Sequence, residues 1–393
     1  MFFKNNHIYL AVLVTYLFLF WIPITAEGQY YEIASFNVIL NKMVLAVIFG
    51  SLLVVSTFHI VRKRVCSDVM FLYCLGSVMV IFNGTALLFT QDMNFILTGF
   101  SLLLAPLIYS LKISQLKYII IFAIIGIALF STLTFIDFIY SSSLNPIIET
   151  RYYYLAEGAD SLRIQNNSLF GQKNAFGAIF SLVFLTLLYL DISNLFENER
   201  RLFYFLLSSS IILLVSSYSG GGVIVGVLGL LLWISNKTKY GFIVGVVLFL
   251  FSLQILFFLG FEEQFTRKIL SASVKLARSE AFLSFVFENP SILLVGFNAF
   301  NSEPFYTEST VLDMVLNFGF LVPAIFTMYV VKKAIESKRG LLIYLYMSIL
   351  FLIFSQNSAF LVPSAIIFLV VGSLQRRIYA LNYVANFGRG GFR

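Results

Sequence analysis

Long apolar runs separated by short polar stretches make up most of the sequence. A helix needs about 20 apolar residues to cross roughly 30 Å of hydrocarbon, and about twelve runs approach this length. Their approximate limits are 8–24, 38–61, 69–89, 95–111, 118–140, 174–190, 202–216, 220–234, 241–260, 309–331, 341–354 and 359–374. The pattern predicts an all-α polytopic integral membrane protein with about twelve transmembrane helices, built as a single domain over residues 1–393.

The composition agrees with this class of protein. Hydrophobic residues make up 60% of the 393 residues and charged residues 11%, whereas a soluble domain carries about 25% charged residues. The first run, 8–24, follows only one basic residue, Lys4, and Ala26-Glu-Gly is a poor match to a small-residue cleavage site. We therefore expect this run to remain as the first transmembrane helix and not to be removed as a signal peptide.

The net charge of +7 comes from short basic clusters between the apolar runs, a distribution that does not suit nucleic-acid binding. Alternate loops carry these clusters: Lys4, Arg62-Lys-Arg64, Lys112, Lys117, Arg200, Arg201, Lys237, Lys239, Lys332, Lys333, Lys338, Arg339, Arg376 and Arg377. The intervening short loops hold Glu27, Glu32 and Asp92 and no positive charge. Because cytoplasmic loops hold the Lys and Arg excess, both termini are predicted to be cytoplasmic.

No metal or cofactor site is expected. Cys66 and Cys74 lie beside and inside one run, and His7 and His59 lie at run ends without a partner at ligand spacing. The sequence has no HExxH, no paired Cys spacing and no GxxxxGK[ST] phosphate loop.

Two long loops depart from the charge rule. Residues 141–173 and 260–308 fall on the extracytoplasmic side of the predicted topology, yet both carry Lys and Arg. One interpretation is that these cations have a binding role; the other is that they are solvated or anchor lipid headgroups.

The second long loop opens with an amphipathic segment. At about 100° per residue, four residues share one narrow sector and three apolar residues lie opposite. The polar sector holds Arg267, Ser271, Lys275 and Arg278, and the apolar one holds Ile269, Leu276 and Leu283. The spacing predicts an amphipathic helix at a membrane surface, with a basic ridge facing the start of the next span.

The chain then turns at Asn289-Pro290 and enters the next apolar run through residues 307–310. Thr310, Asp313 and Asn317 share a helix face in that run, and ionisable residues within a span usually face a water-filled cavity or a partner. A cavity near Glu308 and Asp313 is one interpretation. A salt bridge that only ties this helix to the loop is the other.

The first long loop ends in a polar stretch from Arg163 through Gly171 and Lys173-Asn174 to Gly177. The spacing predicts that a helix begins here, and a helix N-terminus offers free N–H groups and partial positive charge to an anion. With Arg163 and Lys173 beside it, phosphate would be suited to this position. The alternative is an ordinary capped junction between loop and helix.

Small residues recur inside two runs. Gly222-x-x-x-Gly226 and Gly241-x-x-x-Gly245 let helices approach closely, so we interpret both as packing surfaces.

The order of these motifs resembles the O-antigen polymerase and O-antigen ligase superfamily, and the chain is more similar to the polymerases (Wzy). The resemblance covers roughly residues 163–319. It rests on Arg163 before Gly171-x-x-Asn174-x-x-Gly177, Ser217-Tyr-Ser-Gly-Gly-Gly222, Arg278-x-x-x-Phe282, Asn289-Pro290, Gly296-Phe297 and Asn317-Phe-Gly319. Two positions differ: many relatives carry Arg where this chain has Gly220, and the ligases carry His where Glu308 stands.

The resemblance implies an inverting, metal-independent membrane glycosyltransferase of lipopolysaccharide biosynthesis, located in the bacterial inner membrane with its active site facing the periplasm. It would transfer a glycan from undecaprenyl diphosphate to a new lipid-linked repeat unit. Arg163 and Arg278 would hold the diphosphate, and Glu308 would be the catalytic base. Lys173, Asn174, Arg267, Lys275 and Asp313 complete the expected substrate-binding set.

The expected partners are the undecaprenyl-diphosphate-linked oligosaccharide, membrane lipids and a chain-length regulator protein. Two other functions stay open. A ligase that moves the glycan to the lipid A core needs the same chemistry with another acceptor. A flippase for lipid-linked oligosaccharide would show charges along several spans and internal repeats, whereas the ionisable residues here gather on one face of the membrane.

Overall fold

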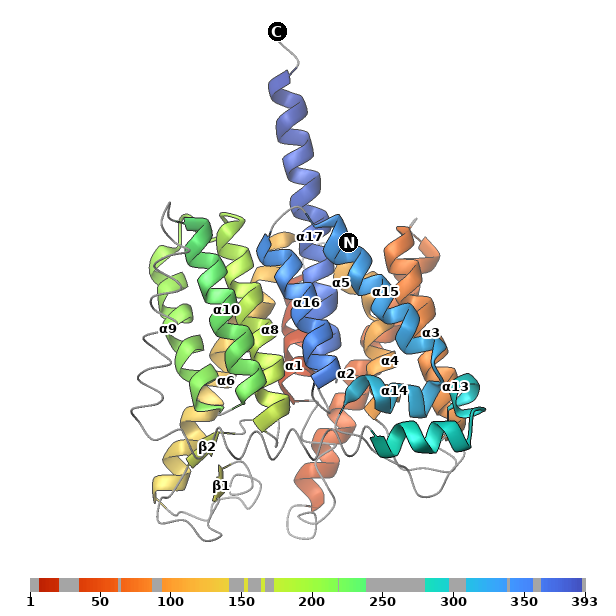
Figure 1. Ribbon diagram of the computed structural model, residues 1–393. Coiled ribbons are helices and arrows are strands. Elements are labelled where there is room, and N and C mark those ends of the chain that lie inside the picture. The colour runs from red at the N-terminus through yellow and green to blue at the C-terminus, as the bar shows by residue number, and fades with distance from the viewer. Residues whose placement is uncertain are drawn as a thin grey trace.

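The computed structural model is a bundle of roughly parallel helices (Figure 1). The residues that it describes are 7–20, 35–62, 65–86, 94–140, 152–154, 164–166, 173–217, 219–237, 280–296, 309–337, 340–355 and 362–390. The described chain is almost entirely helical, in agreement with the all-α prediction.

Most elements follow the apolar runs of the sequence, but the predicted span 309–331 is divided at Gly319 and Phe320 into two helices. In chain order they are α1 (His7–Phe20), α2 (Ser35–Arg62), α3 (Ser67–Ala86), α4 (Asn94–Leu102), α5 (Ala105–Ser110), α6 (Ile113–Tyr140), β1 (Tyr152–Tyr154), β2 (Ile164–Asn166), α8 (Lys173–Ile192), α9 (Arg200–Ser216), α10 (Gly220–Lys237), α13 (Ile292–Val295), α14 (Thr310–Phe318), α15 (Leu321–Glu336), α16 (Gly340–Ser355) and α17 (Val362–Gly390). A further helical segment covers residues 280–288.

Helix α8 lies at the centre of the bundle. It contacts α6, α9, α10, α16 and α17, and every residue from 176 to 191 is buried. Phe176, Phe180 and Phe184 follow one another at four-residue spacing and are fully enclosed, so each turn of the helix fills the space between its neighbours. An apolar helix of this kind is stable only when it is surrounded.

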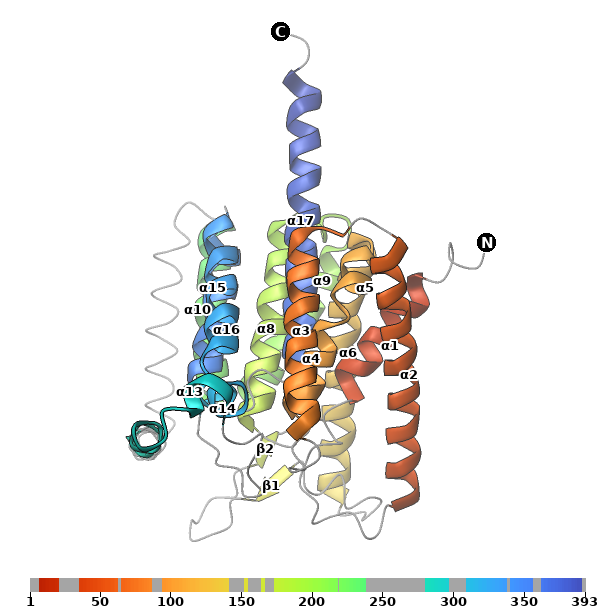
Figure 2. The ribbon, with the colours of Figure 1, turned by 90° about the vertical axis from the view of Figure 1, so that its right-hand side faces the viewer.

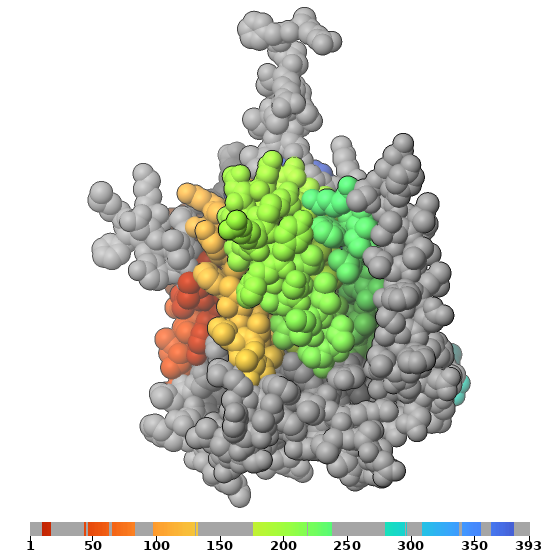
Figure 3. All heavy atoms as spheres, turned by 90° about the vertical axis from the view of Figure 1, so that its left-hand side faces the viewer, coloured from red at the N-terminus to blue at the C-terminus, as the bar shows by residue number. Residues whose placement is uncertain are grey.

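The outer helices expose large apolar side chains. On α2, Val47, Val54 and Val61 are 70%, 70% and 80% exposed, and their seven-residue spacing places them in one stripe. Phe205 and Ile212 of α9 are also exposed. Figure 3 shows the side of the bundle on which α6, α9 and α10 lie. The bundle is therefore apolar both inside and on much of its outer surface.

One helix within the described residues is both long and apolar enough to cross a membrane. This is α10, with 18 residues. The shorter apolar helical stretches in the described part of the chain are Ala46–Arg62, Ser67–Phe82, Leu97–Ser110, Ile113–Leu129, Phe176–Ile192 and Gly340–Phe354. The count of about twelve spans stays a prediction.

The apolar run 95–111 is helical as predicted but has a short interruption, because α4 ends at Leu102 and α5 begins at Ala105. Pro106 lies in the first turn of α5, where its missing N–H costs no hydrogen bond. A neighbouring helix supplies a hydrogen bond to the backbone at the break, because the Ser56 hydroxyl of α2 donates to the Leu103 carbonyl. Hydropathy along the sequence does not reveal this interruption.

The first long loop holds strands where a helix was expected. Tyr152–Tyr154 and Ile164–Asn166 pair antiparallel, with Tyr152 opposite Asn166 and Tyr154 opposite Ile164. Three consecutive tyrosines favour an extended backbone. The expectation of an amphipathic helix in loop 141–173 is therefore not met in its described residues, whereas the second long loop does contain the helical segment 280–288.

The helix ends that carry basic residues gather at one end of the bundle, the upper one in Figure 1. Lys117 of α6 pairs with Glu199 before α9 at 3.0 Å, and Lys333 of α15 pairs with Asp68 of α3 at 2.7 Å. Arg376 of α17 donates to the Cys66 sulfur beside α3. We call this the basic end, and α17 extends beyond the other helices there (Figure 1).

Candidate functional site

The opposite end of the bundle, which we call the loop end, brings together motifs that lie far apart in the sequence. It contains the start of α8, the turn 217–222 between α9 and α10, both strands, the segment 280–288, α13 and α14 (Figures 1 and 2). Helix α16 lies between the two groups of motifs, because it contacts α8 and α10 on one side and α14 on the other.

The start of α8 is in direct contact with the Ser-rich turn. A Cβ added to Gly222 would stand 2.8 Å from the Gly177 Cα and closer still to the Gly177 carbonyl group. A Cβ on Gly177 would collide with the Ser219 side chain. Since both positions leave room only for hydrogen, α8 and α10 cross with their backbones touching. The packing interpretation of Gly222-x-x-x-Gly226 is confirmed, while Gly241-x-x-x-Gly245 lies outside the described residues.

The serines of this turn bond to their own backbone. Ser217 and Ser219 are completely buried. The Ser217 hydroxyl donates to the Leu214 carbonyl at 2.7 Å and accepts from the Ser219 N–H at 3.2 Å. The Ser219 hydroxyl accepts from the Gly222 N–H at 3.4 Å, so it caps the first turn of α10. The turn thus ends α9 and starts α10 within a few residues.

A second pair of motifs meets between α13 and α14. Gly296 and Gly319 have positive φ angles of 80° and 73°, which favour glycine. A Cβ on Gly296 would stand 2.7 Å from the Asn317 carbonyl carbon, and one on Gly319 would stand 2.6 Å from the Leu294 carbonyl oxygen. The Phe320 N–H donates to the Leu293 carbonyl at 2.7 Å. Gly296 therefore packs directly against the Asn317-Phe-Gly319 turn, although Gly296 and Asn317 are 21 positions apart in the sequence.

Asp313 is the sequence-predicted site residue whose side chain the structure describes. It is 7% exposed and lies among Thr310 and Asn317, which are 2% and 4% exposed. The Asn317 side-chain amide donates to the Asp313 backbone carbonyl at 2.7 Å. Helix α14 contacts α3, α13, α15 and α16, so its polar residues are enclosed together with its apolar ones.

The other predicted site residues are placed as follows. Lys173 and Asn174 are the first two residues of α8, as expected for a helix that begins at this junction. Arg163 directly precedes β2 and Glu308 directly precedes Ser309 in the sequence. Arg163, Arg267, Lys275, Arg278 and Glu308 all lie outside the described residues.

Sequence reasoning missed a buried carboxylate at the basic end. Asp191, the next-to-last residue of α8, has a completely buried side chain that pairs with Arg200 of α9. It also pairs with the Lys237 ammonium of α10 at 2.9 Å and accepts from the Trp233 indole N–H at 2.9 Å. Three helices thus share one acidic side chain. An acidic residue at the end of an apolar run, shortly before a basic pair, is the signal that could have indicated it.

Lys333 is a second charged residue whose role was missed. Its ammonium donates to Asp68 at 2.7 Å and to Glu336 at 2.8 Å. Burial alone lowers the pKa of Lys333, but these hydrogen bonds and the two carboxylate charges outweigh burial, so its pKa lies above the ordinary value of 10.5. The group is therefore a fixed cation at neutral pH that joins α15 to α3.

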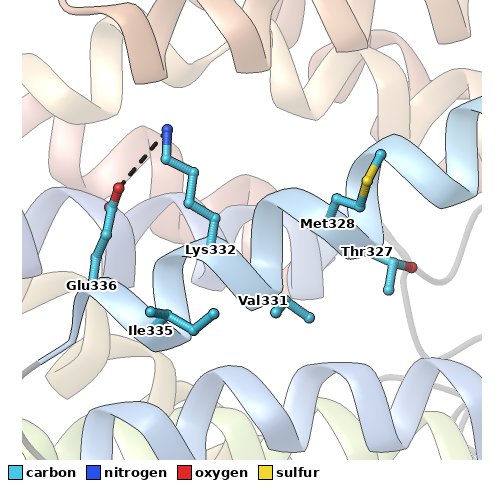
Figure 4. Close-up of a pocket in the computed structure, with 6 residues that line it drawn as sticks. All are labelled: Thr327, Met328, Val331, Lys332, Ile335 and Glu336. Atoms are coloured by element: carbon cyan, nitrogen blue, oxygen red, sulfur yellow. Dashed lines mark ion pairs between the residues drawn. The ribbon is translucent and has the colours of Figure 1, made fainter.

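A pocket of about 340 Å³ lies along the outer side of α15 (Figure 4). Its described lining residues are Thr327, Met328, Val331, Lys332, Ile335 and Glu336. Lys332 and Glu336 form an ion pair at 3.8 Å. The pocket follows the half of α15 that leads to the basic end, away from α14. Asp313, the predicted site residue with a described side chain, is not among its described lining residues.

Comparison with known proteins gives no relative. No family model, curated protein or solved structure matches this chain. Among the described residues, no group of three His, Cys, Asp or Glu side chains is close enough to hold a metal ion.

Proposed function

We propose that this protein is an O-antigen polymerase of the Wzy type. The proposal is supported by one observation: motifs that are far apart in the sequence lie in contact at the loop end. Gly177, four residues after Lys173, packs against Ser219 and Gly222, and Gly296 packs against Asn317. All of these residues belong to the ordered set of motifs on which the resemblance rests.

The proposed location is the bacterial inner membrane, with about twelve spans and the loop end in the periplasm. Support comes from the exposed apolar stripe of α2 and the exposed side chains of α9, which would face lipid. The gathering of Lys117, Lys237 and Lys333 at the opposite end agrees with a cytoplasmic side rich in cations.

The proposed reaction takes place on two lipid-linked glycans. A hydroxyl oxygen of the acceptor sugar attacks the anomeric carbon of the glycan carried by the donor, and the bond from that carbon to the diphosphate oxygen breaks. Undecaprenyl diphosphate leaves with the bonding electrons. Glu308 takes the hydroxyl proton, and Arg163 and Arg278 neutralise the charge that develops on the leaving diphosphate.

The remaining predicted residues assist in this proposal. The start of α8, with Lys173 and Asn174, supplies N–H groups and partial positive charge for a phosphate oxygen. Lys275 and Arg267 extend the basic ridge along the carrier, and Asp313 lines the acceptor side of the site. A chain-length regulator protein is the proposed protein partner.

One observation favours a second candidate function. The interruption between α4 and α5 resembles the discontinuous helices that form substrate sites in transporters, which would suit a flippase for lipid-linked oligosaccharide. However, the residues at the break, Leu102 to Ala105, are apolar. Because these residues offer no charge to a diphosphate, we rank the flippase function below the polymerase. The ligase, which differs from the polymerase only in its acceptor, is ranked beside the flippase.

The deciding experiment is the lipopolysaccharide profile of a deletion strain. A polymerase deletion leaves a single repeat on the core, whereas loss of a ligase or a flippase leaves none.

Complementation with Arg163→Lys and Arg278→Lys tests the site, because Lys lacks the planar fork that binds phosphate oxygens in pairs. Both variants should lose most long chains while they accumulate in the membrane, and Arg201→Lys at the basic end is the matched control. Full chain length with both variants would contradict the assigned roles.

A further inference from the structure

The segment 280–288 lies across the axis of the bundle. In Figure 1 it runs sideways below α13 and α14, and in Figure 2 it is seen end-on. The chain turns after it, with the Ile292 N–H bonded to the Asn289 carbonyl at 3.1 Å, and continues into α13. The segment is therefore parallel to the plane that a membrane would occupy around the bundle.

Its residues divide into three faces. Phe282 and Val286 are buried in a cluster with Ile292 of α13 and with Val315 and Leu316 of α14. This face fixes the segment to α14.

The other two faces are exposed and differ in chemistry. Leu283 and Phe287, four residues apart, are 53% and 82% exposed. Glu280, Ser284 and Glu288 are exposed as well and lie beyond Phe287 on the helical wheel. A helix at a protein–water boundary has polar residues on its whole outer side. Here, instead, one exposed flank is apolar and the other is polar.

The apolar flank continues onto neighbouring elements. Leu294 of α13 is 78% exposed, and Phe320 and Leu321 at the start of α15 are 60% and 65% exposed. These residues are close together, because Gly319 contacts Leu294 and the Phe320 N–H bonds to Leu293. Further along α15, Met328 is 64% exposed, so the apolar surface runs from the segment onto the side of the bundle.

We infer that residues 280–296 form an interfacial element, with Leu283, Phe287 and Leu294 inserted into the acyl chains of the leaflet at the loop end. The polar flank, with Glu280, Ser284 and Glu288, faces the aqueous side. The occupant of the apolar surface is the lipid bilayer, because the surface continues onto the outer side of α15 and is edged by a polar flank. The inference rests on the membrane location in the proposed function.

This element determines the depth of the candidate site. Since Phe282 and Val286 bind α14 through Val315 and Leu316, α14 is held at a fixed distance from the lipid interface. Asp313 then lies at a depth in the membrane close to that of the diphosphate of a membrane-bound carrier. The acceptor sugar would approach from the aqueous side.

The test uses tryptophan as a depth probe in the full-length protein, reconstituted in phosphatidylcholine vesicles. Phe287→Trp reports the apolar flank, Ser284→Trp the polar flank and Met328→Trp the side of α15. The emission of the parent protein, which has two tryptophans, is subtracted. An interfacial helix buries its apolar face about 5–10 Å into the headgroup and acyl boundary. The added emission of F287W should therefore be quenched more by lipids brominated near the headgroup than near the chain end.

The controls separate the possible failures. S284W should be quenched by aqueous iodide, and M328W by lipids brominated near the chain end. If F287W is quenched by iodide and not by lipid while M328W is quenched by lipid, the interfacial inference is overturned and the membrane location stands. If F287W is protected from both quenchers, another protein surface covers the flank and the inference is overturned. If no variant is quenched by lipid, the proposed membrane location itself is wrong. None of these outcomes depends on polymerase activity.

Discussion

The contact between Gly177 and Gly222 makes Gly222→Ala an informative substitution. A Cβ at position 222 would stand 2.8 Å from the Gly177 Cα, whereas carbon atoms attract best at about 3.5–4.0 Å. The obstacle is backbone of α8, which cannot rotate away. Helices α8 and α10 must therefore separate by roughly 0.7 Å or more at the loop end.

The energetic cost follows from this geometry. Overpacking a close contact costs about 1–3 kcal/mol, and a backbone obstacle belongs at the upper end of that range. Alanine is favoured over glycine by up to about 1 kcal/mol in a helix interior, but Gly222 lies in the first turn of α10, where this gain is smaller. We expect Gly222→Ala to lower the free energy of unfolding by about 2 kcal/mol.

Gly226→Ala, one turn further along α10, is the matched control. The nearest atom to its added Cβ is a methyl carbon of Leu214, and the next atoms stand at 3.4 and 3.6 Å. A leucine side chain can change its rotamer at a cost of about 0.5–1.5 kcal/mol, which the helix propensity of alanine offsets. The stability of this variant should remain near that of the parent.

The assay is thermal unfolding in detergent, followed by the glycan length that each variant supports in the deletion strain. Gly222→Ala should melt several degrees below Gly226→Ala and support shorter chains, because the start of α8 is displaced. Equal melting temperatures for the two variants would refute the claim that these backbones touch.

Three further predictions concern charged residues. Glu308→Gln should remove a general-base contribution of about 10²–10⁴ in rate, with Asp313→Asn milder, as measured with purified protein and a lipid-linked repeat unit. Asp191→Asn should cost about 1.5–3 kcal/mol in the free energy of unfolding, because hydrogen bonds to a charged group are lost, whereas the exposed Glu197→Gln should be neutral in the same melting assay. Because the pKa of Lys333 lies above 10.5, its stabilising effect should be complete below that pH and be lost as the pH rises further. The difference in Tm between the parent and Lys333→Gln should therefore stay constant up to about pH 10 and narrow above it.

Each of these predictions has an opposing outcome. Near-normal polymerisation by Glu308→Gln with collapse in Asp313→Asn would transfer the base role to Asp313. An unchanged Tm for Asp191→Asn would mean that Arg200 and Lys237 do not depend on this carboxylate. A Tm difference for Lys333→Gln that persists unchanged above the folded pKa would point to packing of its methylene chain instead of its charge.

Hydrophobic periodicity and length predicted most helix positions well. The run 69–89 corresponds to α3 (Ser67–Ala86), and the run 202–216 corresponds to α9 (Arg200–Ser216). Such runs are long and uniformly apolar, so burial of side chains fixes their position. The alternation of basic loops also predicted which helix ends meet, since Lys117, Lys237 and Lys333 all lie at one end.

The failures have local and long-range causes. Pro106 interrupts an apolar run without changing its hydropathy, and Tyr152-Tyr-Tyr154 forms a strand because a partner, Ile164–Asn166, is available. The pairing of Lys333 with Asp68 joins residues 265 positions apart, and no local pattern encodes such a choice. In the candidate site, the start of α8 at Lys173 was predicted from capping signals, whereas the enclosure of Asp313 depends on helices packed around α14.

The two attachments of α8 to α10 have a mechanical consequence. The pair is joined at one end through Gly177 and Gly222 and at the other through Asp191, Trp233 and Lys237. Two helices that are joined at both ends cannot easily rotate relative to each other, so we expect α8 and α10 to keep their relative position. Any movement that widens the loop end is then expected on the other side of α16, away from α8 and α10.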